Sequence, residues 1–340
     1  MYDVITNRKM DRQYPVIDIV KFICAFLVVA IHKKPFTSYY DSNELYKYLD
    51  FGIANYLARI AVPFYFSAAG FLLFRKIDFE KFDVTITKNY IFRNLRLLGI
   101  WVILLFVGED WQLWYMKGLI VAVCLLTVLL HKKVSLRRMT IIAVILYVIG
   151  LIGDSYYGLL NCLPAFKPFN YIVKVFKALP TTRNGIFMGF PFLLLGGIIE
   201  KKQLPVKPGL TIFGFVISMI LLFCETFFIE KMGFPRNYNM YVFLVPAVFF
   251  SLLFAVNTSA SPRTIYKEMR CVGIVIYFSH LFVYWWIMKC FDVMNMLFGI
   301  GTYNSLIAYF LTIIISTAFG VIIYELSQNR KCAFLRYLYS

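Results

Sequence analysis

The stretch IDIVKFICAFLVVAIH (Ile17–His32) decides how the chain is interpreted. Its second half is apolar enough to cross a membrane, yet the stretch carries Asp18, Lys21 and His32. An α-helix turns by about 100° and rises by about 1.5 Å per residue, so Lys21 and His32 lie within about 20° of each other and about 16 Å apart along the axis. Asp18 precedes Lys21 by three residues and shares that side. Because ionisable groups in membrane helices face the protein interior or a water-filled cavity, the stretch predicts a polar stripe turned away from lipid.

Composition places the whole chain in the membrane class. Its 340 residues are 61% hydrophobic with a mean hydropathy of +0.72, well above a soluble domain. The net charge of +17 comes from basic residues in short loops, so it indicates membrane orientation rather than nucleic-acid binding. The seven cysteines form no Cys-x-x-Cys or other metal-binding spacing, so we expect neither a metal site nor a bound cofactor.

Apolar runs recur along the chain and predict an all-α integral membrane protein, a bundle of about ten transmembrane helices in a single domain, 1–340. A span needs roughly 20 mainly apolar residues. The ten candidates cover approximately 16–33, 52–74, 91–108, 112–130, 139–157, 184–200, 210–230, 240–257, 271–290 and 303–325.

The basic residues predict which loops are cytoplasmic. With the N-terminus inside, the inner segments (1–15, 75–96, 131–138, 201–209, 258–270, 326–340) hold 22 Lys and Arg residues. The outer segments (33–50, 109–111, 154–183, 231–239, 291–302) hold 9. Positive residues are enriched in cytoplasmic loops, so we predict a multi-pass plasma-membrane protein with both termini in the cytoplasm.

Further polar residues lie at membrane depth and are candidates for the same interior. Arg59 and His280 each lie within an apolar run, Lys117 follows WQLWYM, and Arg183 opens TTRNGIFMGF. Two histidines at this depth, His32 and His280, make an acid–base pair conceivable. A structural role is equally consistent with His280 taken alone. Asp18 and Lys21 have such an alternative as well, as an ion pair near the inner surface, but it does not explain why they align with His32.

Several motifs, in chain order, resemble those of the acyltransferase 3 family of membrane acyltransferases. Lys21 and His32 fit its Arg/Lys-x10-His motif in the first helix. The segments RIAVPFYFSAAGFLL, RNLRLL, QLWYMKGL and GIVIYFSHLFV resemble its later motifs, so the resemblance covers nearly the whole chain. YVIGLIGDSYYGLL and TTRNGIFMGFPFLLLG look closer still to the membrane domain of the vancomycin-resistance membrane-bound serine racemases. We expect no racemase domain here, because the sequence stops at Ser340.

The family resemblance implies transfer of an acyl group, usually acetyl, from cytoplasmic acyl-CoA to an extracytoplasmic acceptor such as a carbohydrate. Acetyl-CoA is then a co-substrate. Lys21, Arg93 and Arg96 would bind CoA phosphates as charged donors, although Arg93 and Arg96 also simply satisfy the positive-inside rule. His32 would act as the general base or accept the acyl group, and Asp18 would keep Lys21 charged. The candidate acceptor or ligand residues are Arg59, Trp114, Tyr115, Asp154, Ser155, Arg183, Asn184, Tyr277 and His280.

Two other functions fit the same residues. The first is a permease-like protein for serine or another amino acid, in which Arg183 binds the ligand carboxylate and Asp154 its ammonium group. The alternative for these two residues is a structural ion pair. The second is a catalytically silent membrane partner of a separate racemase or cell-wall enzyme. In every case the lipid bilayer is the surrounding medium.

Overall fold

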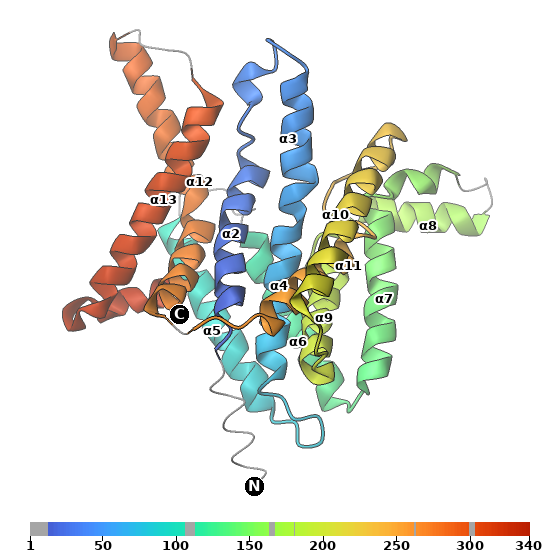
Figure 1. Ribbon diagram of the computed structural model, residues 1–340. Helices are drawn as coiled ribbons and strands as arrows, with labels where there is room; N and C mark the ends of the chain where they lie inside the picture. The colour runs from blue at the N-terminus through green and yellow to red at the C-terminus, as the bar shows by residue number, and fades with distance from the viewer. Residues whose placement is uncertain (1–12, 106–112, 163–166, 180, 262, 299–302) are drawn as a thin grey trace. The chain divides into compact units, whose positions relative to one another are not determined.

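The computed structural model of residues 1–340 describes residues 13–105, 113–162, 167–179, 181–261, 263–298 and 303–340 (Figure 1). Every regular element in these ranges is helical, so the all-helical prediction is confirmed for them. The chain divides into two compact units. Unit 1 contains Pro63–Phe92 and Tyr115–Thr258, and unit 2 contains Tyr14–Val62, Arg93–Trp114 and Ser259–Ser340.

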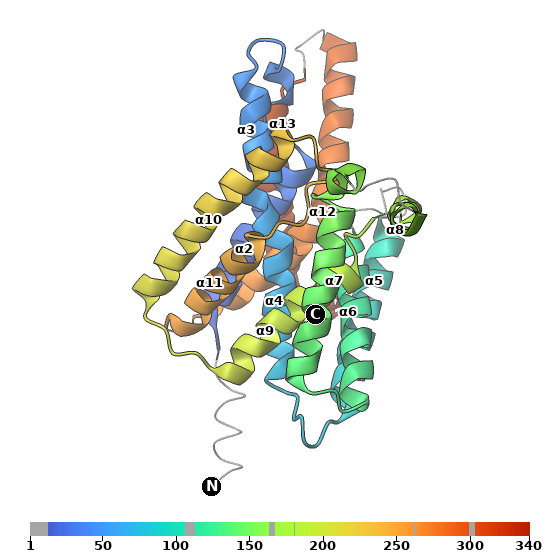
Figure 2. The ribbon, with the colours of Figure 1, turned by 90° about the vertical axis from the view of Figure 1, so that its right-hand side faces the viewer.

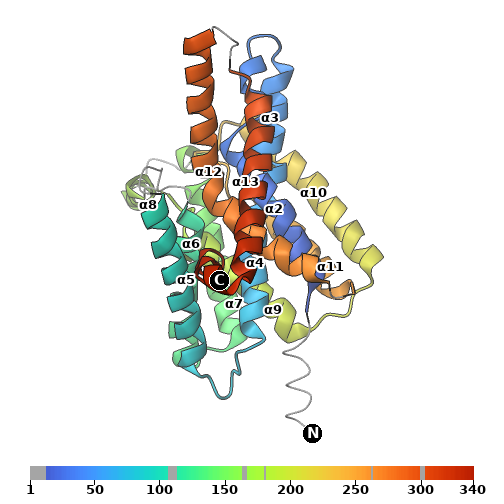
Figure 3. The same cartoon turned by 90° about the vertical axis from the view of Figure 1, so that its left-hand side faces the viewer.

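Unit 2 is built on α2 (Pro15–His32), α12 (Thr264–Phe298) and α13 (Ser305–Gln328), seen side by side in Figure 3. Pro15 opens α2, a position where its missing N–H is not needed. Asn304 caps α13 through its side-chain oxygen, which accepts hydrogen bonds from the first free N–H groups of the helix. The smaller elements are η1 (Thr37–Tyr39), α3 (Leu45–Asn55), η2 (Leu57–Ile60) and η6 (Arg330–Leu338), together with the second half of α5 (Val84–Leu104).

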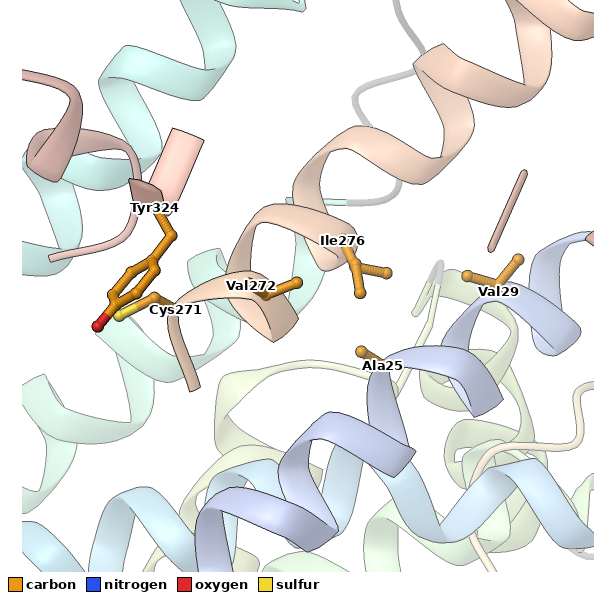
Figure 4. Close-up of a cluster of buried hydrophobic side chains, with 6 residues drawn as sticks. All are labelled: Ala25, Val29, Cys271, Val272, Ile276 and Tyr324. Atoms are coloured by element: carbon orange, nitrogen blue, oxygen red, sulfur yellow. The ribbon is translucent and has the colours of Figure 1, made fainter. Parts of the chain in front are cut away.

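The core of unit 2 forms where these three long helices meet. Its buried members are Ala25, Val29, Cys271, Val272, Ile276 and Tyr324 (Figure 4). Close approach of α13 to α12 depends on Gly320, where a Cβ would lie 2.8 Å from Cγ1 of Val272. Helices in lipid associate through such small residues because apolar burial alone gives them little driving force.

Unit 1 contains most of α4 (Ala61–Phe74), α6 (Trp114–His131), α7 (Leu136–Gly153), α9 (Phe190–Lys202), α10 (Pro208–Lys231) and α11 (Leu244–Asn257), with η4 (Tyr157–Cys162), α8 (Lys167–Ala178) and η5 (Gly185–Gly189) between them (Figure 2). Two glycines join α4 to α9. A Cβ on Gly70 would clash with the carbonyl oxygen of Leu193, and one on Gly196 would clash with that of Ser67. These backbones therefore touch, and the glycines of FSAAGF and LLLGG are packing residues.

Seven helical runs among the described residues are long and apolar enough to cross a membrane. They are Pro15–His32, Leu45–Phe74, Trp114–His131, Leu136–Gly153, Pro208–Lys231, Thr264–Leu297 and Ser305–Gln328, and they indicate a multi-pass membrane protein. They match seven of the ten expected spans, so the expectation of about ten is not confirmed.

Each of the other three expected spans departs for its own reason. The run 91–108 falls in α5, whose apolar part is interrupted by Arg93 and Arg96, and residues 106–108 and the outer segment 109–111 lie outside the described residues. The run 184–200 is divided between η5 and the 13-residue α9. The run 240–257 is helical only from Leu244, and the 14 residues of α11 span about 21 Å, against about 30 Å of hydrocarbon.

Expected inner and outer segments gather at opposite ends of each unit. In unit 1, the Nζ of Lys201 donates to the Ile77 carbonyl at 2.7 Å, joining two inner segments, and Figures 1 and 2 place the α6–α7 and α9–α10 loops at the same end. At the other end, the outer segments meet where the N–H of Gly158 donates to the carbonyl of Phe234 at 2.7 Å. In unit 2, Asp18, near the inner end of its expected span, meets Arg270 of an inner segment, and Ser38 of an outer segment meets Ser305, near the outer end of its expected span. The alternation of the two kinds of segment is therefore consistent within each unit.

We predict that the loops 131–138 and 201–209 face the cytoplasm, because both are basic and lie at one end of unit 1. Single cysteines introduced at Lys132 or Lys207 in a cysteine-free background should react with an impermeant maleimide only after the cell membrane is opened. A cysteine at Arg236, which belongs to an outer segment, serves as the control and should react in intact cells. Labelling of either basic loop in intact cells would reverse the orientation.

Candidate functional site

The polar stripe of α2 faces α12. Near the start of both helices, Asp18 lies 3.8 Å from the Nη1 of Arg270. Further along, the ring of His32 stacks on that of His280, with centroids 5.4 Å apart and ring planes at 21°. The two helices therefore run in the same direction, with a polar contact at each end of their interface. This places the predicted stripe against protein, as the cost of charge in lipid requires.

His280 is fully buried, and its ring orientation is set by the backbone of its own helix. Its Nδ1 lies 3.1 Å from the carbonyl oxygen of Ile276 and 2.8 Å from that of Tyr277. The neighbouring Phe278 stacks on Trp101 of α5, at 5.0 Å between centroids and 5° between planes. Trp101 therefore packs on a different side of α12 from His280, since Phe278 and His280 are two residues apart on the helix. Tyr277, a predicted ligand residue, contributes its carbonyl group to His280.

A cation adjoins the histidine pair. The Nζ of Lys33, the residue after His32, lies 3.9 Å from the centroid of the Tyr284 ring, and the hydroxyl groups of Tyr284 and Tyr303 are 2.7 Å apart. Lys33 is also close enough to His280 for electrostatic interaction. Two imidazoles, one ammonium group and a phenol pair therefore form one polar cluster, which we call the histidine cluster: His32, Lys33, His280, Tyr284 and Tyr303.

A second group in unit 2 lies at the start of α2 and is mainly basic. Lys21 is within electrostatic reach of Asp18, Arg270 and Arg93. Arg270 did not stand out in the sequence, because a basic residue in an inner segment is expected there. Asp18 thus interacts with two basic groups, Arg270 through the ion pair and Lys21 through electrostatic attraction.

Arg96 and Arg59, two further predicted site residues of unit 2, have structural contacts. The Nη2 of Arg96 donates to the carbonyl oxygen of Ser340 at 3.0 Å, and its guanidinium group lies 4.7 Å from the Tyr337 ring centroid. Arg96 therefore holds the segment around η6 against α5. Arg59, on η2 beside α2, donates from Nη2 to Oδ1 of Asn55 at 2.7 Å.

In unit 1, the candidate carboxylate Asp154 binds the backbone of the segment before α11. Its Oδ1 accepts from the N–H groups of Asn239 at 2.7 Å and Met240 at 3.1 Å and from the hydroxyl group of Ser155 at 3.0 Å. Its Oδ2 accepts from the side-chain amide of Asn239 at 2.9 Å. Asp154 and Ser155 are both fully buried. This geometry gives both residues structural contacts, and it leaves their proposed contact with a ligand as a hypothesis.

Arg183 is connected to Asp154 through Asn239. The Nδ2 of Asn239 donates to Asp154, so its Oδ1 is left for Arg183, whose Nη1 lies 3.4 Å away. Asn184 caps η5, because its side-chain oxygen accepts from the N–H groups of Ile186 and Phe187. The structure thus brings together Asp154, Ser155 and Arg183, with an amide between the two charged groups.

A second buried carboxylate, Glu225 of α10, supports the same segment. Its Oε1 accepts from the N–H of Val242 at 2.6 Å and from the hydroxyl group of Tyr156 at 2.6 Å, and its Oε2 accepts from the N–H of Phe243 at 2.9 Å. Burial, together with the hydrogen bond to Glu225, raises the pKa of Tyr156, so its hydroxyl group remains a donor. The sequence signal for Glu225 was an acid inside the apolar run LLFCETFF.

The remaining candidates lie at the start of α6. Tyr115 packs its ring against Tyr65 at 5.6 Å and Phe66 at 4.8 Å between centroids, and Trp114 is the first residue of the helix. Tyr115 therefore belongs to an aromatic cluster of unit 1. No group of three or more metal-ligating side chains occurs in the described part of the chain.

We predict that Arg183→Lys changes amino-acid binding by less than about threefold, because its contact with Asn239 needs one donor, which lysine also supplies. Radioligand binding on purified protein measures this. A loss of tenfold or more would mean that the planar fork of Arg183 holds a ligand carboxylate. The Asp154 and Arg183 double variant separates the roles further: for a structural link it should be less harmful than the sum of the single changes.

Comparison with known proteins identifies a class of relatives. The chain is 28% identical over 345 residues to an amino-acid racemase of Enterococcus faecalis, covering 94% of this chain and 46% of that protein. It is 30% identical over 293 residues to a serine/alanine racemase of Enterococcus gallinarum, covering 78% of this chain and 40% of that protein. No family model and no solved structure matches, so the acyltransferase 3 resemblance gains no support.

The chain therefore spans less than half the length of these relatives while matching them over most of its own. The regular elements in the described part of the aligned region are all helices, and seven helical runs are long and apolar enough to cross a membrane. What this chain shares with proteins named as racemases is thus a membrane region.

Proposed function

We propose that this protein is a permease-like membrane protein that binds a small amino acid of the serine type and delivers it to a racemase. The observation that carries the proposal is the match to proteins named amino-acid and serine/alanine racemases over 78–94% of this chain. A membrane region in such proteins would serve to carry the substrate across the bilayer, because a zwitterionic amino acid does not cross a bilayer unaided.

The histidine cluster is the site that we propose for this ligand. A zwitterion needs polar partners at membrane depth, and such groups are expensive unless they serve a function. Lys33 supplies a cation for the ligand carboxylate, and its ammonium group lies over the Tyr284 ring and within electrostatic reach of His280. Asp154 is a poor partner for the ligand ammonium group, because four donors already occupy its two oxygens.

Serine binding and uptake by the purified protein test the proposal. The full chain is reconstituted in nanodiscs for equilibrium binding of labelled L-serine, and in vesicles for uptake. We expect saturable binding, weakened about 10- to 100-fold by Lys33→Gln through loss of a charge-assisted hydrogen bond. Lys34→Gln is the matched control, an exposed lysine one position further along. Absence of serine binding and uptake in correctly inserted wild-type protein would refute the proposal.

Acyl transfer is the second candidate function, favoured by the basic group at the start of α2. Asp18 interacts with Arg270 and Lys21, and Arg93 lies within electrostatic reach of Lys21; such a basic group suits the phosphates of acetyl-CoA. In that mechanism His32 takes the proton of an acceptor hydroxyl group. Release of free CoA from acetyl-CoA by the same preparation, in the absence of serine binding, would favour this function over the first.

A further inference from the structure

We infer that the Nε2 atom of His280 accepts a hydrogen bond from the side-chain hydroxyl group of the ligand, so that the histidine cluster selects serine over alanine. This inference rests on the proposed function and names the group that gives it specificity.

The protonation of His280 follows from its neighbours. Both atoms within hydrogen-bond distance of Nδ1 are carbonyl oxygens, of Ile276 and Tyr277. Carbonyl oxygens only accept, so the neutral ring must carry its hydrogen on Nδ1. Nε2 is then a lone-pair acceptor.

That acceptor is buried and has no hydrogen-bond partner among the residues that the structure describes. Buried polar atoms are nearly always satisfied, and an exception calls for an explanation. His32 does not supply a hydrogen bond through the stacked contact, because stacking joins ring faces and a ring nitrogen bonds in the ring plane. A donor from a ligand accounts for the unpartnered atom.

The surrounding charges determine which donor fits. Lys33 lies within electrostatic reach of His280, and Arg59 is carried by η2, which packs against α2. The acid of the adjoining helix α3, Asp50, is fully buried and accepts from the N–H of Phe36 and the hydroxyl group of Tyr40. An ammonium donor would be repelled by Lys33, whereas a neutral hydroxyl group would not.

Serine carries such a hydroxyl group, and alanine leaves Nε2 without a donor. Sites that bind a ligand hydroxyl group discriminate strongly against analogues that lack it. L-2-Aminobutyrate, in which a methyl group replaces the hydroxyl group of serine, has nearly the same shape and the same backbone charges but no side-chain donor. We expect wild-type protein to bind L-serine at least about tenfold more tightly than L-alanine or L-2-aminobutyrate.

The test compares Kd values for these three amino acids in wild type, His280→Phe and the control His131→Phe. Phenylalanine keeps an aromatic ring against His32 but lacks the acceptor, and His131 is the exposed last residue of α6. We expect His280→Phe to bind serine and 2-aminobutyrate equally, while His131→Phe keeps the wild-type ratio.

Two outcomes would overturn the inference: an unchanged serine preference in His280→Phe, or wild-type protein that binds serine and 2-aminobutyrate equally. The second needs no variant and so stands even if His280→Phe fails to fold. Wild-type protein that binds none of the three refutes the proposed function itself, which is a different result.

Discussion

His32→Ala is expected to lower serine uptake at least about tenfold while leaving the protein folded and inserted. The ring of His32 covers one face of His280 at 5.4 Å. Its removal loses an aromatic contact of about 0.5–1.5 kcal/mol and opens a gap beside the proposed site. His32 is the last residue of α2, so the helix itself should be little affected. Uptake by reconstituted vesicles measures the loss, and His131→Ala is the control.

The size of the His32→Ala effect also separates the two candidate functions. A general base contributes about 10²–10⁴-fold to a reaction rate. A loss of that size in release of CoA from acetyl-CoA would assign His32 to acyl transfer. Near-normal activity of His32→Ala in both assays would show that the polar stripe of α2 is structural.

Asp154→Ala is expected to destabilise unit 1 by about 3–5 kcal/mol. The substitution leaves the N–H groups of Asn239 and Met240 buried without an acceptor, at about 1–3 kcal/mol each, and it also removes the partner of the Asn239 amide. Thermal unfolding in detergent measures the change, followed by the reactivity of a single cysteine that replaces Ala247, a buried residue of unit 1, in a cysteine-free background.

The matched control for Asp154→Ala is Asp78→Ala. Asp78 also accepts a backbone N–H, that of Glu80 at 2.9 Å, but it lies exposed in a loop, where such changes stay within about 0.5 kcal/mol. Equal stability of the two variants would contradict the structural role of Asp154. Asp154→Ala protein that folds normally but loses serine binding would return this carboxylate to the ligand site.

Composition and recurring apolar runs determined the class of protein, and helix periodicity determined the direction of its first polar stripe. Three residues spaced at 18, 21 and 32 share one helix face whatever surrounds them, because the backbone sets 100° per residue. In the structure this face meets α12, as the membrane cost of charge requires. Seven of the ten expected spans were also readable from the apolar runs. One of the other three, 240–257, is shortened because backbone hydrogen bonds to Asp154 and Glu225 hold the chain out of a helix before α11.

Only the tertiary structure decided the partners. Helical geometry does not specify which distant residue a side chain meets, so the contacts of Asp18 with Arg270 and of His32 with His280 could not be read from spacing. The same holds for Asp154. Its charge suggested a ligand or an ion pair with Arg183, whereas its oxygens accept the N–H groups of a segment 85 residues away. Sequence alone determines which polar and ionisable groups must be shielded from lipid. The packing of helices that are remote in sequence decides which partners these groups bind, because hydrogen bonds and ion pairs depend on distances that only the folded chain sets.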